Sequence, residues 1–130
     1  MGFHLNSIFR RVLQILIFIA ILLGLIFLYF NRDQSIDFSV QLPPELEYCE
    51  TVIESNSLEY LRLKNWLESN QDGWKNTIAT YVPVNTVRAP TISINILQNF
   101  VVINYQDKNK KWSQVVKQKK GVILLFCNKK

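Results

Sequence analysis

The residue types that could do chemistry in this 130-residue chain are two cysteines, ten carboxylates, a lysine-rich segment and one histidine. Cys49 and Cys127 are too far apart in the sequence for a Cys-x-x-Cys redox pair, and two thiols are too few for a four-thiolate zinc site. They are suited to a disulfide, which in the chain-entropy model would add about 4–5 kcal/mol to the stability of a small domain by closing so long a loop. Two unpaired buried thiols are the alternative.

Few of the side-chain combinations used in catalysis are available. His4 is the only histidine and precedes a long apolar stretch, so a Ser/His or Cys/His pair and a histidine-bearing metal site are not expected in the rest of the chain. The four glycines form no phosphate-binding loop. Nine carboxylates between residues 33 and 72 leave paired-carboxylate hydrolysis open, but their spacing is typical of helix surfaces. We expect no enzyme, no metal and no cofactor.

Charge is divided unevenly along the chain. Residues 31–72 carry nine acidic and three basic side chains, whereas residues 73–130 carry ten basic and one acidic. Either the two halves pack together and neutralise each other, or the lysines form a patch for an anionic lipid, an acidic protein or a cell-wall polymer. Nucleic acid is not expected. The candidate patch consists of Trp112 with Lys108, Lys110, Lys111, Lys117, Lys119 and Lys120.

Residues 12–30 contain no charged side chain and predict a membrane-spanning helix. As a helix, this stretch covers about 28 Å, close to the hydrocarbon thickness of a bilayer. A cleaved signal peptide is the alternative, but bulky residues rather than a small-residue cleavage pattern follow the apolar core. A buried helix would need a larger surrounding domain. The anchor positions include Val12, Leu16, Phe18, Leu22, Leu25 and Phe30.

The charges beside this helix predict its orientation. Arg10 and Arg11 precede it, whereas only Arg32 follows it closely. We expect residues 1–11 to be a short cytoplasmic stub, and the C-terminal domain to lie outside the inner (plasma) membrane, in the periplasm of a bacterium or in the extracellular space.

The rest of the chain predicts one small α+β domain with one or two helices and an antiparallel sheet. Residues 31–44 would be a linker or an edge strand, and the domain proper would cover 45–130. Pro43 and Pro44, followed by three glutamates, predict a first helix with Leu46, Cys49 and Ile53 on one face.

A second helix is predicted between Asn56, as its cap, and the Asp72–Gly73 stop. Its apolar face would consist of Tyr60, Leu63, Trp66 and Leu67, although a strand over 58–63 is an alternative. Ile92–Ile96 alternates apolar with polar residues and should pair with 100–105 as a hairpin. The other expected β segments are 78–82, 84–88, 112–119 (a strand or a short helix) and 122–127.

The aromatic residues are candidate binding anchors or core residues. Trp66 and Trp74 lie next to the second helix and its stop, so they are expected to fill the junction between helix and sheet. Trp112, surrounded by lysines, is expected to be partly exposed.

The segments 63–67, Asn70, Gly73–Trp74 and 81–83 resemble small single-span bacterial membrane proteins of unknown function, some of immunity-protein type. This resemblance implies binding rather than catalysis. We therefore expect a membrane-anchored extracytoplasmic protein-interaction module that acts as an immunity protein or as an accessory protein of an envelope complex. The alternative is an anionic lipid- or polymer-binding domain that uses residues 108–120, whose contacts would weaken steeply with salt.

Overall fold

The computed structural model describes residues 2–121 of the chain, with side chains from residue 7 onward. The chain divides into two compact units, Met1–Arg32 and Asp33–Lys130. The division follows from composition, because the first unit is one apolar helix and the second has its own core.

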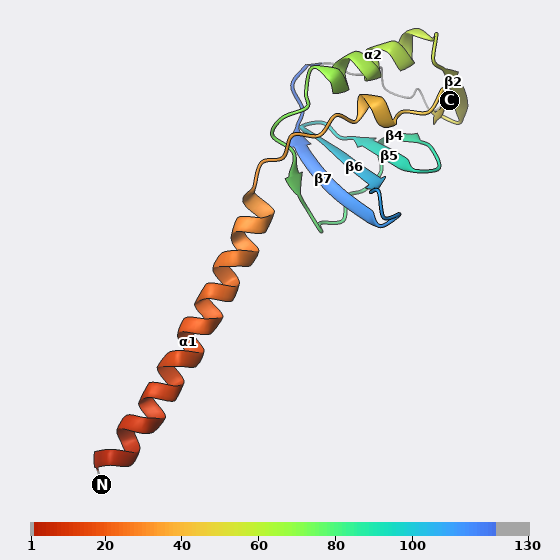
Figure 1. The fold of residues 1–130 in the computed structure, drawn as a ribbon. Coiled ribbons are helices and arrows are strands. Elements are labelled where there is room, and N and C mark those ends of the chain that lie inside the picture. Colours follow the sequence, from red (N-terminus) through yellow and green to blue (C-terminus); the bar gives the residue numbers. More distant parts are fainter. Residues whose placement is uncertain (1, 122–130) are drawn as a thin grey trace. The chain divides into compact units, whose positions relative to one another are not determined.

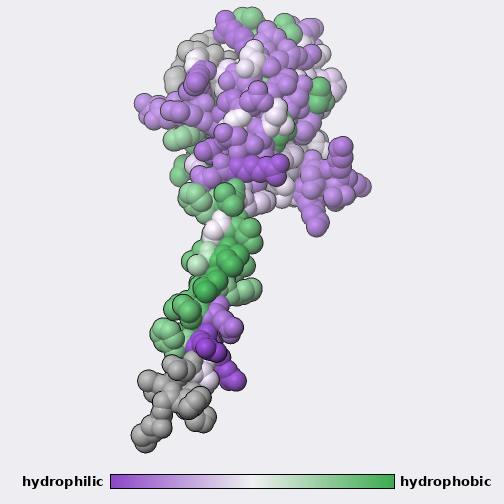
Figure 2. All heavy atoms as spheres, turned by 60° about the vertical axis from the view of Figure 1, so that its left-hand side comes forward, coloured by the Kyte–Doolittle hydropathy of each residue, from purple (hydrophilic) through white to green (hydrophobic). Residues whose placement is uncertain are grey.

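The first unit is α1 (Gly2–Asn31), a single helix that also contains residues 2–11 of the expected stub. Its segment Ser7–Asn31 is long and apolar enough to cross a membrane, and none of it is buried within the protein. Figure 2 shows apolar side chains along most of this helix and hydrophilic ones toward its N-terminal part. The anchor positions expected from the sequence all lie in α1, with Arg10 and Arg11.

The second unit is built on an antiparallel sheet, which has seven strands in the described part of the chain (Figure 1). The strand order is β2-β1-β4-β5-β6-β7-β3. The strands are β1 (Glu45–Tyr48), β2 (Thr51–Glu54), β3 (Lys75–Asn76), β4 (Asn85–Arg88), β5 (Ile92–Ile96), β6 (Phe100–Gln106) and β7 (Trp112–Gln118). This confirms the α+β class and the hairpin formed by β5 and β6.

One face of the sheet, here called the inner face, carries the core. Ile92, Ile94 and Ile96 all point to it and are buried, because successive side chains of a strand alternate between faces. The helix α2 (Leu58–Glu68) covers this face (Figure 1) through its buried side chains Tyr60, Leu63, Trp66 and Leu67. These are the four residues that the 3.6-residue period predicted.

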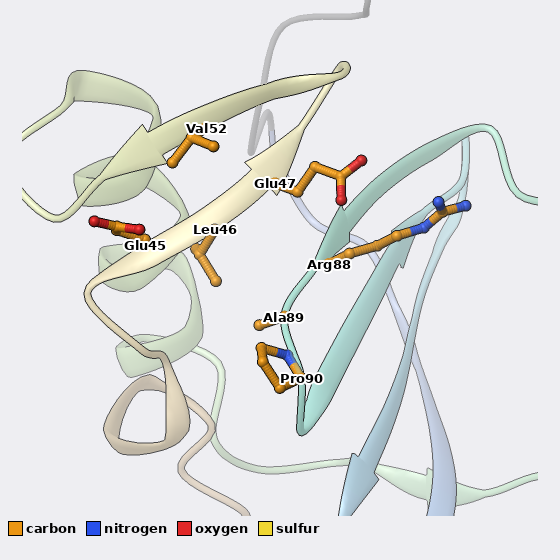
Figure 3. A pocket seen from close by; sticks show the side chains of 7 residues that line it. All are labelled: Glu45, Leu46, Glu47, Val52, Arg88, Ala89 and Pro90. Atoms are coloured by element: carbon orange, nitrogen blue, oxygen red, sulfur yellow. The ribbon is translucent and has the colours of Figure 1, made fainter.

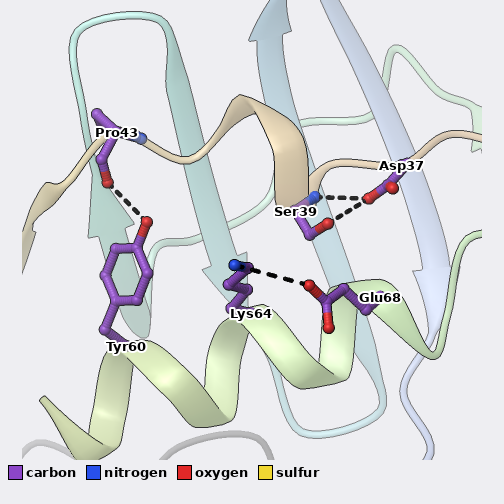
Figure 4. Close-up of polar contacts among 6 residues, drawn as sticks. All are labelled: Asp37, Ser39, Pro43, Tyr60, Lys64 and Glu68. Carbon is purple, nitrogen blue, oxygen red and sulfur yellow. Dashed lines mark hydrogen bonds and ion pairs between the residues drawn. The ribbon is translucent and has the colours of Figure 1, made fainter. Parts of the chain in front are cut away.

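Local polar contacts fix the start of α2 and the segment before β1. The hydroxyl of Ser57 caps α2 by accepting from the Tyr60 amide, so the cap is one residue later than expected at Asn56. The Tyr60 hydroxyl donates to the carbonyl oxygen of Pro43 at 2.9 Å (Figure 4). A short 3-10 helix, η1 (Ser39–Gln41), begins where Asp37 accepts from the amide and hydroxyl of Ser39.

The opposite, outer face of the sheet is crossed by residues 77–84, here called the strap, which connect β3 to β4. Asn95 points to this face, and its side chain accepts from the Val84 amide and donates to the Val82 carbonyl oxygen. The prediction of a strand at 78–82 was therefore wrong. The segment has no regular secondary structure, and the buried Asn95 side chain holds its C-terminal part by hydrogen bonds.

The prediction of a first helix after Pro43–Pro44 was also wrong, because β1 and β2 form a hairpin there. Leu46 and Tyr48 are buried while Glu45 and Glu47 are exposed, which is the two-residue period of a strand. The turn residues Cys49 and Glu50 have φ angles of 51° and 62°. Such turns usually contain Asn-Gly, so the usual sequence signal was missing.

Candidate binding surfaces at the two ends of the sheet

The ends of the sheet differ in what they contain. Trp74 pairs with Gln34, so the chain coming from α1 joins the domain close to the end where β7 stops and β6 begins. We call this the entry end; it also contains the β1–β2 turn. The opposite, far end contains the β4–β5 turn and the β6–β7 loop.

At the far end, β1 and β4 separate and leave a hollow between them. Their pairing consists of Glu47 with Arg88 and Tyr48 with Val87. Continuing this register would place Pro90 opposite Glu45, and proline has no amide to donate to a neighbouring strand. The ladder therefore stops, and the gap has a volume of about 420 Å³.

The hollow combines an apolar floor with charged groups at its rim (Figure 3). Leu46, Ala89 and Pro90 lie together at its centre. The Arg88 guanidinium points away from the Glu47 carboxylate, and neither belongs to an ion pair among the described residues. The residues that line the hollow are Glu45, Leu46, Glu47, Val52, Arg88, Ala89 and Pro90.

The glutamates of the β1–β2 hairpin increase the negative charge at this rim. Glu45 faces Glu54 across the hairpin, and like charges directly opposite each other in a sheet are destabilising. Val52, on the same outer face, is 66% exposed. The hollow thus offers apolar surface beside unneutralised carboxylates and one free guanidinium. Because the site is open to solvent, it suits a protein surface better than a small molecule.

The lysine-rich segment does not form one patch. Lys108, Lys110 and Lys111 lie in the β6–β7 loop at the far end. The other three lysines lie near or beyond the opposite end of the seven-residue strand β7, toward the entry end. The loop is compact because the Asp107 carboxylate accepts from the amides of Asn109 and Lys111. Its lysines are exposed.

The side chain of Lys117 makes its contacts within the domain. Its ammonium donates to the carbonyl oxygens of Asn70 and Asp72, just beyond α2, and lies 5.7 Å from the centre of the Trp74 ring. Burial lowers the pKa of Lys117, an effect that the nearby Asp72 carboxylate partly opposes. This lysine is therefore used within the domain and is a poor candidate for binding an external anion.

Lys119 and Lys120 lie at the entry end. The Lys119 amide donates to the Asn99 carbonyl oxygen in the β5–β6 turn. The Lys120 carbonyl oxygen accepts from the Trp66 indole at 3.0 Å, and its side chain is exposed.

The tryptophans lie where the sequence placed them. Trp74 is fully buried, and its ring meets those of Phe38 and Trp66 edge to face. Trp112 is 56% exposed at the far end, beside the lysine loop. Half-buried Tyr81 belongs to the strap.

Cys49 lies in the β1–β2 turn at the entry end, whereas Cys127 and the β segment expected at 122–127 lie outside the described residues. The disulfide between them therefore stays a prediction. Among the side chains that the structure describes, residues 7–121, no three histidine, cysteine, aspartate or glutamate residues gather closely enough to hold a metal ion.

Together, these features define a small α+β domain that follows an apolar helix and has different surfaces at the two ends of its sheet. Comparison with known proteins adds no identity, because no protein-family model, curated protein or solved structure matches the chain.

Proposed function

We propose that this chain is a membrane-anchored, non-catalytic module that binds a protein partner through the far end of its sheet. The observation that carries this proposal is the hollow beside Pro90, where apolar surface lies next to the free charges of Glu45, Glu47 and Arg88. Interfaces commonly combine a buried apolar centre with a charged rim. The partner would present an apolar side chain flanked by basic residues.

The anchor supports this role. In the proposal, α1 spans the inner membrane with Arg10 and Arg11 on the cytoplasmic side, and residues 33–130 lie outside. Confinement to a membrane raises the effective concentration of a membrane-proximal partner. A role as an immunity protein or as an accessory protein of an envelope complex would suit this arrangement.

The orientation can be tested in bacteria with alkaline phosphatase, which folds to its active form only outside the cytoplasm. A fusion after Lys130 should be active, and a fusion before Met1 should be inactive. Replacing Arg10 and Arg11 with glutamate should reduce the activity of the C-terminal fusion. Activity only in the N-terminal fusion would contradict the orientation.

The protein interaction can be tested with the full chain in its native membrane. A photo-crosslinking residue, benzoylphenylalanine, would replace Val52 at the hollow, with Gln118 at the entry end of the same face as the matched control. One protein should be captured from Val52 and not from Gln118. Glu47→Lys should abolish capture, because it reverses a rim charge. Equal capture at both positions, or none, would contradict a binding site at the hollow.

The lysine-rich segment remains the second candidate, for an anionic lipid or polymer. Because Lys117 is used inside the domain, only the three loop lysines and Trp112 form a continuous exposed group at the far end. Binding by this group should fall steeply as salt rises, whereas a protein interface centred on the apolar floor should persist at moderate salt.

A further inference from the structure

The two edges of the sheet differ in whether another segment pairs with them. At one edge lies β3, and the residue before it, Trp74, exchanges backbone hydrogen bonds of 2.8 and 3.1 Å with Gln34. The segment at Gln34 therefore covers the start of that edge. At the opposite edge lies β2, and no segment within the described residues pairs with its outward side. This four-residue strand has no proline, lysine or bulge, which are the usual means of protecting an open edge.

The hairpin turn decides which backbone groups of β2 point outward. The turn has two residues, both with positive φ, and in such a hairpin the flanking residues, Tyr48 and Thr51, form a hydrogen-bonded pair. Opposite pairs then alternate, so Val52 and Glu54 direct their amides away from β1. The Glu54 carbonyl oxygen accepts from the amide and hydroxyl of Ser57. Among the described residues, the amides of Val52 and Glu54 and the Val52 carbonyl oxygen are therefore available to another strand.

The side chains around this edge are acidic. Glu45, Glu47 and Glu54 are exposed on the outer face of the hairpin, and Glu50 is exposed in its turn. None of these four glutamates belongs to an ion pair among residues 7–121. The guanidinium of Arg88 lies on β4, with β1 between it and β2. The edge therefore favours a partner that carries positive charge.

The same charges disfavour a second copy of the chain as the occupant. Two β2 strands paired antiparallel about Val52 would bring Glu54 of each copy opposite Glu50 of the other, and like charges directly opposite each other are destabilising. Charged side chains at an open edge commonly prevent edge-to-edge association. Here they are all negative, so the edge rejects an acidic strand and accepts a basic one.

We propose that the partner binds β2 as an added strand, through an extended segment whose basic residues face the glutamates. Hydrogen bonds to the backbone of Val52 and Glu54 would provide affinity, and the alternate side chains would provide specificity. This inference rests on the proposed function for the existence of a protein partner, and it names the part of that partner that is recognised. Val52 also lines the hollow, so the added strand and the hollow would form one continuous binding surface.

The test uses the full chain in a neutral detergent and three fluorescent peptides of equal length. One peptide alternates lysine with valine, and one alternates glutamate with valine. The third alternates lysine with proline, which keeps the positive charge but removes every second amide donor. Fluorescence anisotropy should show that the lysine–valine peptide binds several-fold more tightly than either control. Equal binding of the three peptides, or no binding of the lysine–valine peptide, would overturn the proposal.

Hydrogen exchange distinguishes an added strand from a cation that adheres to an acidic surface. Measured by NMR on the isotope-labelled full chain, exchange of the Val52 and Glu54 amides should slow several-fold when the lysine–valine peptide binds. The amides of Thr51 and Ile53 face β1, so their exchange should change little. Binding without slower exchange at positions 52 and 54, or with the same change at all four positions, would refute strand addition.

Two substitutions test the backbone and the charge separately. Val52→Pro removes one outward amide, and the ladder with β1 does not use that amide, so proline is tolerable at this edge position. It should weaken binding of the lysine–valine peptide several-fold, whereas Val52→Thr keeps both the amide and the β-branch and is the matched control. Glu54→Lys should weaken this peptide and strengthen the glutamate–valine peptide. Equal binding by the proline and threonine variants would contradict a role for the amide.

Exchange in the chain without peptide reports on other occupants of the edge. Slow exchange at positions 52 and 54 before any peptide is added would show that the edge is already filled, by the chain itself or by a second copy, and would overturn the proposal. The photo-crosslinking test at Val52 reports on the proposed function. A protein captured there, without slower exchange of the edge amides when the lysine–valine peptide is added, would support the hollow and refute strand addition.

Discussion

The ammonium of Lys117 lies 5.7 Å from the centre of the Trp74 ring and donates a hydrogen bond to the backbone just after α2. Lys117 thereby ties β7 to the segment that follows α2, across 47 residues of sequence, by donating to the Asn70 carbonyl oxygen at 3.0 Å. Trp74 donates to the same carbonyl oxygen. This group of contacts joins the helix, the sheet and the entry end.

Replacing Lys117 with methionine should therefore destabilise the domain. The carbonyl oxygens of Asn70 and Asp72 lose a charged donor and Trp74 loses a cation, at a cost of about 1–3 kcal/mol. Lys119→Met is the matched control and should change stability by less than about 0.5 kcal/mol. Tryptophan fluorescence during urea unfolding of the full chain in detergent measures both. Similar stabilities for the two variants would contradict this role.

A second prediction concerns alkaline pH. Burial raises the pKa of Tyr60 above its ordinary value of 10.0, and burial, then the Glu59 carboxylate, raises the pKa of Tyr48. Above pH 10 the unfolded chain releases these protons before the folded domain does, so stability present at lower pH should be lost as the pH rises.

Tyr48→Phe with Tyr60→Phe should make the melting temperature fall less between pH 9 and pH 11, measured by circular dichroism, than it does in the parent chain. At neutral pH, Tyr60→Phe alone should cost about 1 kcal/mol, because the Pro43 carbonyl oxygen loses its donor. An unchanged alkaline profile would show that these tyrosines do not control it.

How much the sequence could predict depended on how local each signal was. The face of α2 and the β5–β6 hairpin were predicted because their periods lie within a few neighbouring residues. The hollow could not be predicted, because it requires knowing that β1 pairs with β4, about 40 residues later. Lys117 is similar: its sequence neighbours indicate a charged patch, whereas its contacts come from residues 70–74.

The β1–β2 turn gives a stabilising substitution. Glu50 has a φ of 62°, which costs a residue with a Cβ roughly 1–2 kcal/mol and costs glycine little. Glu50→Gly should therefore stabilise the domain by about 0.5–1 kcal/mol, after allowing for the greater entropy of glycine in the unfolded chain. Glu54→Gly, in the adjoining strand, should destabilise it by about 0.5–1 kcal/mol. Urea unfolding compares the two, and destabilisation by Glu50→Gly would contradict the expected relief of strain.

The remaining prediction is the disulfide between Cys49 and Cys127. Cys49 lies at the entry end, where β7 also ends, so residues 119–121 leave the sheet at the same end as Cys49. Denatured but unreduced protein should resist alkylation, and both thiols should be alkylated after reduction. Labelling of both thiols without reduction would refute the bond.

If the bond forms, Cys49→Ser and Cys127→Ser should destabilise the domain equally, by about 4–5 kcal/mol in the chain-entropy model. The double variant should lose no more than either single variant, because each substitution alone already opens the loop. Reducing agent should lower the melting temperature of the parent chain and leave all three variants unchanged. Unequal single losses would instead indicate that the two side chains stabilise the domain through separate contacts.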